Sequence, residues 1–305
     1  MTSTAFRPNL FVLGAMKAGT TTVYRQLEQW PGVCVSRPKE PCFFERDYEE
    51  GLDYYQRTYF AHWQGEPWIC DCRTSHLYLP YVPALIQETN PQARLIAILR
   101  NPIERAYSEW KQWYAAGREQ LDFAEAVADN YTSLKNGRRL DSPEGIRMHY
   151  RSLGFEQDST HAVEFYRAYL DIGHYDEQCR WYLDRFPRAQ VLFLKFDDLA
   201  NNGNDVMRCI GRFLEQDADS VLPQTVQQEN RGETRLYRRL CRTYECSGLR
   251  HVLPVSLRTR AKRLALWAGR DRGMPETTRS LLREYYRPRI EALEALLGWD
   301  LGHWQ

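Results

Sequence analysis

The stretch LFVLGAMKAGTTT, from Leu10 to Thr22, runs from a continuous apolar segment into a loop of Gly, Lys and Thr. Such a run predicts a buried strand, and the threonines after it begin a helical period. A strand that turns tightly into a helix leaves backbone N–H groups unpaired at the positive end of the helix dipole. The stretch therefore predicts a loop that binds an anionic phosphoryl or sulfuryl group, although a Gly-rich turn can also simply connect two elements.

This loop departs from the usual nucleotide-binding loop. That loop reads G-x-x-x-x-G-K-[ST], with the Lys on the outer phosphates and the Ser or Thr on magnesium. Gly14 and Gly19 keep the spacing, but Thr20 occupies the Lys position, and Lys17 lies inside the loop. A later apolar run ends in Arg100, where a magnesium-dependent phosphotransferase would carry an Asp. A cation after each of these strands predicts an anion site without a metal.

Apolar runs that alternate with helical periods predict the fold class. The expected strands lie at 10–14, 68–72, 95–99 and 191–196. The expected helices between and after them lie at 20–30, 102–117, 174–186 and 205–214. This alternation indicates an α/β fold, a P-loop-like doubly wound parallel sheet flanked by helices. Ligands of such sheets bind beyond the carboxyl ends of the strands, where Lys17 and Arg100 both fall.

The chain of 305 residues is expected to form a single domain over residues 1–305. Residues 117–162 are polar with weak periodicity, and we expect an insertion there near an acceptor cleft. Residues 224–305 are expected to form an Arg-rich helical C-terminal region that covers the site. The side chains expected to face inward from its last helix are Leu281, Leu282, Tyr285, Ile290, Leu293 and Leu297.

Composition excludes several classes of protein. The formal net charge of +1 argues against nonspecific nucleic-acid binding, which needs a strong basic excess. No stretch approaches the roughly eighteen apolar residues that span a bilayer, so we expect a cytoplasmic protein without membrane or nucleic-acid partners. The 8 cysteines include no C-x-x-C pair that would suggest zinc or a redox dithiol.

Three motifs together carry a family resemblance. The motifs are KAGTTT at Lys17–Thr22, KEPCFF at Lys39–Phe44 and LRNPIERAYS at Leu99–Ser108. In this order they resemble the sulfotransferases that use 3′-phosphoadenosine 5′-phosphosulfate (PAPS), and among these the heparan-sulfate type and its bacterial relatives. The later pattern GHY at 173–175 and DDL at 197–199 is also similar to that family, so the resemblance covers roughly residues 9 to 215.

The resemblance implies which residues bind PAPS. The first loop would hold the 5′-phosphosulfate through Lys17, Ala18, Gly19, Thr20, Thr21 and Thr22. Arg100 and Ser108 match the pair that holds the 3′-phosphate, by a charged fork and a hydroxyl donor. The alternative for Arg100 is an ion pair with a local carboxylate such as Glu104. Arg231 and Arg235 occupy the zone where the family closes a basic loop over the nucleotide.

The resemblance also implies catalytic roles. Lys17 would neutralise charge on the bridging oxygen as the S–O bond breaks. Glu40, in the Lys-Glu-Pro motif, would be the general base that removes the acceptor proton. The alternative is a surface Glu40 that pairs with Arg37 or Lys39. Arg73 matches a Lys in the family, so we expect it to contact the sulfuryl group or the acceptor.

These residues predict a PAPS-dependent sulfotransferase without a metal. Its acceptor would be a hydroxyl or amine of a small-molecule metabolite or a sugar. One alternative is a nucleotide kinase, in which Asp197 or Asp198 would hold magnesium, and another is a noncatalytic nucleotide-binding protein. The side chains of His149, His161 and His174 could serve as bases on the acceptor side, or they could be structural.

Overall fold

The structure is a computed structural model that describes residues 6–153, 165–217, 219 and 273–305. The chain divides into two compact units. The first unit comprises Met1–Asn101, His174–Gln228 and Ala292–Trp299. The second comprises Pro102–Gly173, Glu229–Glu291 and Asp300–Gln305. All strands of the described ranges fall in the first unit. A single domain over the whole chain stays a prediction.

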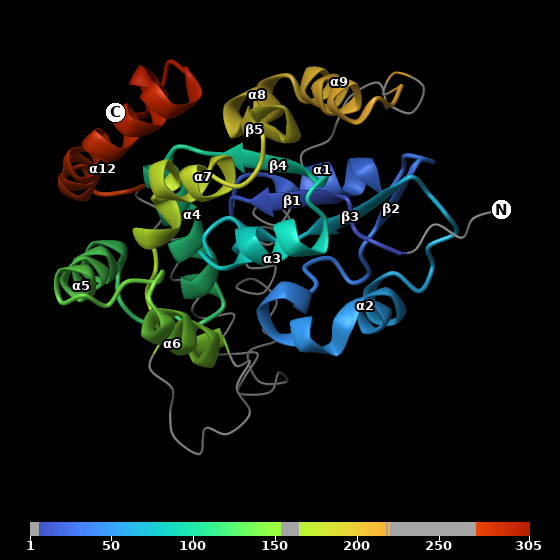
Figure 1. The fold of residues 1–305 in the computed structure, drawn as a ribbon. Coiled ribbons are helices and arrows are strands. Elements are labelled where there is room, and N and C mark those ends of the chain that lie inside the picture. The colour runs from blue at the N-terminus through green and yellow to red at the C-terminus, as the bar shows by residue number, and fades with distance from the viewer. Residues whose placement is uncertain (1–5, 154–164, 218, 220–272) are drawn as a thin grey trace, which may run out of the picture. The chain divides into compact units, whose positions relative to one another are not determined.

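The first unit is built on a five-stranded parallel sheet in the order β2-β3-β1-β4-β5 (Figure 1). Its strands are β1 (Leu10–Gly14), β2 (Val33–Val35), β3 (Trp68–Cys72), β4 (Arg94–Leu99) and β5 (Val191–Lys195). The central strand β1 is buried along its whole length, as expected for a strand covered on both faces. The predicted α/β fold with a parallel sheet flanked by helices is thereby confirmed.

Among the helices of the first unit, those at 20–27, 175–183 and 203–214 were predicted, whereas those at 51–59, 82–89 and 196–201 were not. In chain order these helices are α1 (Thr20–Leu27), α2 (Gly51–Tyr59), α3 (Val82–Thr89), α7 (Tyr175–Leu183), α8 (Phe196–Asn201) and α9 (Gly203–Leu214). A short π-helical turn, Phe43–Asp47, precedes α2. The prediction missed β2 because its three residues are too short to show a period. It also extended β5 by one residue, since Phe196 already begins α8.

The helices α4 (Pro102–Ala115), α5 (Phe123–Lys135) and α6 (Pro143–Leu153) lie in the second unit. Pro102 begins α4 as predicted, because the fixed φ of proline suits a first helical position. The polar segment 117–162 contains two of these helices, α5 and α6. A capping box fixes the start of α5, in which the Asp122 side chain accepts from the Glu125 N–H and the Glu125 side chain accepts from the Asp122 N–H, both at 3.0 Å.

The C-terminal helix α12 (Glu276–Leu297) corrects part of the predicted inward face. Leu282, Ile290 and Leu293 are buried as expected, and Leu297 is half-buried. Leu281, however, is 49% exposed, and Tyr286 is fully buried in place of Tyr285, which is only half-buried. The buried residues Leu282, Tyr286, Ile290 and Leu293 are three or four positions apart and so lie on one face of the helix. Leu281 lies outside this face. Across the described ranges, no helix has the length and apolar character needed to cross a membrane.

Candidate active site

The carboxyl ends of three neighbouring strands, β3, β1 and β4, are followed by Arg73, by the loop with Lys17 and by Arg100. Backbone hydrogen bonds tie the segments that leave these strands. The Arg73 N–H after β3 donates to the Val12 carbonyl of β1 at 3.2 Å, and the Ala15 N–H after β1 donates to the Ile98 carbonyl of β4 at 2.7 Å. The segments therefore begin side by side at one edge of the sheet, where parallel α/β sheets bind ligands.

The β1–α1 loop, residues 15–19, has an unusual backbone. Lys17 has a φ of 67° and Gly19 a φ of 84°, both in the left-handed region. A Cβ atom at Gly19 would lie 2.8 Å from Cδ2 of Leu199, and this crowding together with the left-handed backbone favours glycine there. A lysine with positive φ costs free energy and is typical of functional sites, where the surrounding structure holds it.

The start of α1 supplies N–H groups for an anion. Gly19 is the N-cap residue of α1, and no side chain caps the helix there. Thr20 and Thr22 are buried, whereas Thr21 is half-buried. The residues predicted to hold the 5′-phosphosulfate thus form one continuous loop and first helical turn, and their binding role stays a prediction.

Arg100 lies next to this loop at the end of β4. Its Nη1 donates to the carbonyl of Lys17 at 3.0 Å, and its guanidinium carbon lies 4.7 Å from the centre of the Phe196 ring. A guanidinium over an aromatic ring is held by a cation–π interaction and stays charged. The structure therefore brings together Lys17 and Arg100, the two cations that the sequence placed after neighbouring strands.

The other predicted nucleotide residues lie elsewhere. Ser108 is on α4 in the second unit, and its pairing with Arg100 stays a prediction. Glu104, the alternative partner of Arg100, forms an ion pair with Arg279 at 2.6 Å. The predictions for Arg231, Arg235 and His161 concern residues outside the described ranges.

The remaining histidine and aspartate candidates have separate positions. His149 is buried in α6 of the second unit, and His174 is buried directly before α7 in the first. Asp197 and Asp198 lie in the first turn of α8. Within the described ranges, no group of three or more His, Cys, Asp or Glu side chains could hold a metal ion.

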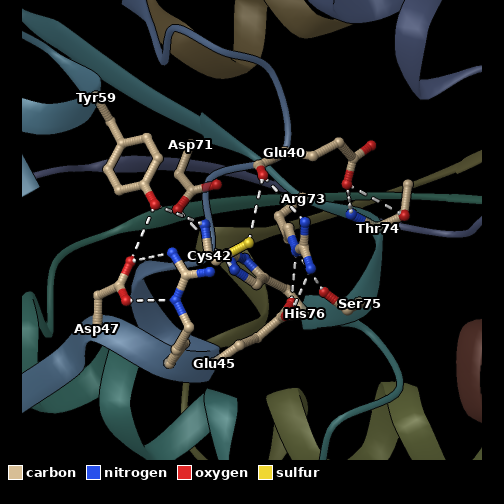
Figure 2. A network of polar contacts seen from close by, with 11 residues as sticks. Glu40, Cys42, Glu45, Asp47, Tyr59, Asp71, Arg73, Thr74, Ser75 and His76 are labelled. Atoms are coloured by element: carbon tan, nitrogen blue, oxygen red, sulfur yellow. Dashed lines mark hydrogen bonds and ion pairs between the residues drawn. The ribbon is translucent and has the colours of Figure 1, made fainter. Parts of the chain in front are cut away.

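Glu40 is held at the end of β3 by backbone and side-chain contacts (Figure 2). Its N–H donates to the Cys72 carbonyl at 3.1 Å. Its carboxylate Oε2 accepts from the Thr74 N–H at 2.9 Å and from Thr74 Oγ1 at 3.3 Å. Like Lys17, Glu40 has a φ of 67°, so both predicted reactive residues carry a left-handed backbone.

Lys39 forms an ion pair with the other carboxylate oxygen, Oε1 of Glu40. Burial by itself lowers the pKa of Lys39, whereas the Cys72 thiol and the Glu40 carboxylate raise it, and the net shift is upward. Lys39 is therefore a cation at neutral pH. The pair matches the alternative reading of Glu40 as a partner of Lys39, and it is compatible with catalysis because both side chains stay partly exposed.

Arg73 points its guanidinium into a polar network. Nε and Nη2 donate to the two carboxylate oxygens of Glu45 at 2.6 and 2.5 Å, Nε also donates to Ser75 Oγ at 2.9 Å, and Nη1 donates to the Glu40 carbonyl at 3.0 Å. Burial lowers the pKa of Arg73, but Glu45 more than offsets this by hydrogen bonding and charge, and the net shift is upward. A contact from Arg73 to a sulfuryl group or acceptor stays a prediction.

A buried layer lies behind these residues. Tyr55 donates its hydroxyl proton to Asp71, and His76 Nε2 lies 3.9 Å from Asp71 Oδ2. Burial raises the pKa of Asp71 to about 8. Burial, followed by the charge of Arg73, lowers the pKa of His76 to about 3. At neutral pH both groups are therefore mostly uncharged, and the layer contributes little charge of its own.

Sequence reasoning missed Thr74 and Glu45, the two partners that hold Glu40 and Arg73. The available signal was weak. An Arg directly after a buried strand needs a carboxylate partner, but the chain offers 40 acidic residues and no spacing rule selects Glu45. Thr74 follows Arg73 directly, but its N–H and hydroxyl point toward Glu40 only because of the conformation of the turn after β3, which the sequence does not show.

The parallel sheet with this loop, an adjacent Arg and a held carboxylate defines a transferase of anionic groups. The chain belongs to the sulfotransferase family, because the model of the sulfotransferase domain matches residues 7–242. The resemblance predicted from the motifs is thereby confirmed, and membership implies PAPS as the co-substrate.

Curated relatives agree with this family. Heparan sulfate glucosamine 3-O-sulfotransferase 3A1 of Mus musculus is 24% identical over 207 residues, which are 68% of this chain and 45% of that protein. Bifunctional heparan sulfate N-deacetylase/N-sulfotransferase 2 of Homo sapiens is 26% identical over 214 residues, 68% of this chain and 22% of that protein. The chain thus spans less than half the length of these two relatives.

Among solved structures, a sulfotransferase from Alicyclobacillus acidocaldarius has the same fold. It matches with a TM-score of 0.68 and 24% identity, over 98% of this chain and 99% of that one.

Proposed function

We propose that this protein transfers a sulfuryl group from PAPS to a hydroxyl or amine of a small-molecule metabolite or a sugar, without a metal. One observation carries the proposal. The groups that the reaction needs lie at the carboxyl ends of three adjacent parallel strands: Glu40 comes after β2 in the chain and is hydrogen-bonded to the end of β3, Lys17 follows β1, and Arg100 follows β4. A nucleotide that is charged at both ends of its ribose fits this row of charges.

The β1–α1 loop and the start of α1 would receive the 5′-phosphosulfate. The N–H groups of the first helical turn and the Lys17 ammonium supply positive charge where the leaving oxygen becomes negative. Arg100, stacked on Phe196 beside the loop, would bind the 3′-phosphate together with Ser108. This division of charge favours PAPS over a nucleotide that lacks the 3′-phosphate.

Glu40 would act as the general base. The acceptor oxygen or nitrogen attacks the sulfur and forms a new bond, while the S–O bond to the nucleotide breaks. The acceptor proton moves to the Glu40 carboxylate, and the electron pair of the broken bond stays on the phosphate oxygen that Lys17 neutralises. The products are the sulfated acceptor and 3′-phosphoadenosine 5′-phosphate (PAP).

Two observations bear on the acceptor. Both curated relatives are named for heparan sulfate, which supports a sugar. The chain has 9 Trp and 19 Tyr, which supports an aromatic-lined pocket for a small molecule. Both acceptor classes offer the hydroxyl or amine that the chemistry requires.

The test is PAP release from PAPS in the presence of acceptor panels, one of amino sugars and oligosaccharides and one of small phenols, alcohols and amines. Release with one panel, unaffected by EDTA, is the expected result. Loss of PAP release in EDTA would contradict transfer without a metal, whereas magnesium-dependent phosphoryl transfer from ATP without PAP release would favour the kinase. Tight PAP binding without release from either panel would favour a noncatalytic nucleotide-binding protein. Calorimetry that showed binding of ATP but not PAP would overturn the proposal.

A further inference from the structure

We propose that Thr74 and the Arg73–Glu45 ion pair are positioning residues that fix the Glu40 carboxylate for proton transfer, and that Arg73 acts through Glu40 without touching the reacting atoms. This inference rests on the proposed role of Glu40 as the general base. It assigns functions to Thr74 and Glu45 and gives Arg73 a role different from the one expected from its sequence position.

Thr74 determines which carboxylate oxygen of Glu40 takes the proton. Both Thr74 donors, the N–H at 2.9 Å and the hydroxyl at 3.3 Å, reach the same oxygen, Oε2. A carboxylate oxygen has room for about two hydrogen bonds, so Thr74 fills Oε2. Oε1, which faces Lys39, retains room for a further bond. The acceptor proton therefore goes to Oε1.

Arg73 holds the backbone of Glu40. A non-glycine residue with a φ of 67° stays in that conformation only when its surroundings hold it. The Glu40 N–H is bonded to Cys72 at 3.1 Å, and its carbonyl accepts from Arg73 Nη1 at 3.0 Å. Both groups of this strained peptide are thereby tied to the end of β3, which sets the direction in which the carboxylate leaves the chain.

Glu45 in turn orients Arg73. Its carboxylate accepts the Nε and Nη2 groups as a two-pronged pair, which leaves Nη1 directed at Glu40 (Figure 2). The Glu45 side chain is 2% exposed, so it does not reach an acceptor, and its two hydrogen bonds to Arg73 connect it to Glu40. A lysine at position 73 would keep the charge but could not span both partners, because its single ammonium lacks the planar fork.

The first experiment compares Thr74→Val with Thr74→Ser. Val keeps the shape and the backbone N–H but removes the hydroxyl, and we expect kcat to fall about tenfold with an unchanged KM for PAPS, since one of two hydrogen bonds to Oε2 is lost. Thr74→Ser keeps the hydroxyl and is expected to recover most of kcat. A merely structural Thr74 would change the melting temperature without this separation of kcat from KM.

The second experiment measures coupling between positions 73 and 45. Arg73→Lys and Glu45→Gln are each expected to lower kcat tenfold or more with little change in PAP affinity. The double variant is expected to be no worse than the poorer single variant, because both break one unit. Arg46→Lys is the matched control: Arg46 forms a similar two-pronged pair with Asp47 at 2.6 and 3.0 Å, and the structure records no bond from it to Glu40, so we expect unchanged kcat.

Three results would overturn the inference: normal kcat in Thr74→Val, normal kcat in Arg73→Lys, or losses that multiply in the double variant. If Glu45→Gln does not fold, the comparison of Thr74→Val with Thr74→Ser tests the inference instead. Thr74 is only half-buried, so we expect both of these variants to fold. Glu40→Gln distinguishes failure of the proposed general base from failure of the proposed positioning residues. Normal transfer in Glu40→Gln would remove the general base itself, whereas lost transfer there with normal Thr74→Val and Arg73→Lys would remove only the positioning roles.

Discussion

The β1–α1 loop and the segment around Glu40 use the same backbone device with different support. In each, a charged residue has a φ of 67°, and its carbonyl accepts at 3.0 Å from the Arg that follows a neighbouring strand: Arg100 holds Lys17, and Arg73 holds Glu40. Arg100 stacks on the ring of Phe196, whereas Arg73 is buried against Glu45. Arg73 is thus engaged by a buried carboxylate, whereas the contact described for Arg100 beyond the loop is an aromatic ring, and we propose that Arg100 binds the anion.

The largest expected effect is that of Glu40→Gln. Gln keeps the size and can still accept from Thr74, but it does not take up the acceptor proton. We therefore expect turnover to fall by about 10²- to 10⁴-fold, the usual contribution of a general base, with unchanged affinity for PAP. Steady-state kinetics and calorimetry measure the two quantities. A near-normal rate would show that Glu40 is not the general base, so that it and Lys17 do not have the two separate roles that we propose.

Lys17→Ala is expected to have the next largest effect. Loss of the ammonium removes charge stabilisation at the leaving oxygen, which should lower turnover by about 10²- to 10³-fold. The melting temperature should change little, because Ala accepts the same backbone strain as Lys at this position. Thermal unfolding followed alongside kinetics tests both points. If stability fell and turnover did not, Lys17 would belong to the scaffold of the loop and not to the reaction.

The contrast between the two arginines is tested most directly by matched Lys variants. Arg100→Lys removes both the fork and the stacking on Phe196, and we expect PAP affinity to fall about tenfold. Arg73→Lys should leave PAP affinity nearly unchanged. Calorimetric titration of both variants with PAP gives the comparison. Equal losses in the two variants would mean that the arginines do not have separate tasks.

The smallest expected effect concerns stability and pH. The pKa of Asp71 is about 8 in the folded protein and 3.8 in the reference state, so between these values the folded protein holds a proton that the unfolded chain has lost, and stability falls as pH rises. His76, with a pKa of about 3 against 6.5, has the opposite slope below pH 6.5, and the two cancel there. We expect a net loss of about 1 kcal/mol between pH 6.5 and 8.

Asp71→Asn should abolish this loss, because Asn carries no proton to release. Denaturant unfolding of both proteins at several pH values measures it. A wild-type stability that stayed constant from pH 6.5 to 8 would show that Asp71 is not protonated in the folded layer behind Glu40.

Much of the fold could be predicted because its signals are local. The strands β1 and β4 contain continuous apolar runs, β3 is apolar except for Asp71, and Pro102 marks the start of α4. The strand β2 was missed because three residues show no period, and α5 was missed although Asp122 and Glu125 form a capping box. The predicted inward face of α12 wrongly included Leu281, which is exposed. The sequence shows which residues are apolar, but two adjacent leucines do not show which of them faces the core.

The β1–α1 loop could also be predicted from sequence, whereas the contacts that support Glu40 and Arg73 could not. The β1–α1 loop is contiguous in sequence, so its Gly, Lys and Thr pattern could be read directly. The support of Glu40 comes from Thr74, 34 positions away, and the support of Arg73 comes from Glu45, 28 positions away. Such partnerships depend on the direction in which side chains leave a turn and a π-helical segment, which no periodicity records.

The bond from Arg100 to the carbonyl of Lys17 has a consequence for anyone who redesigns this catalyst. One guanidinium supports the peptide that presents the ammonium and, in our proposal, also recognises the far end of the cosubstrate. Libraries that vary position 100 to accept a different nucleotide would therefore also disturb the presentation of the ammonium. Compensating changes should be sought at other positions of the β1–α1 loop, because Lys17 itself supplies the ammonium and has to be kept.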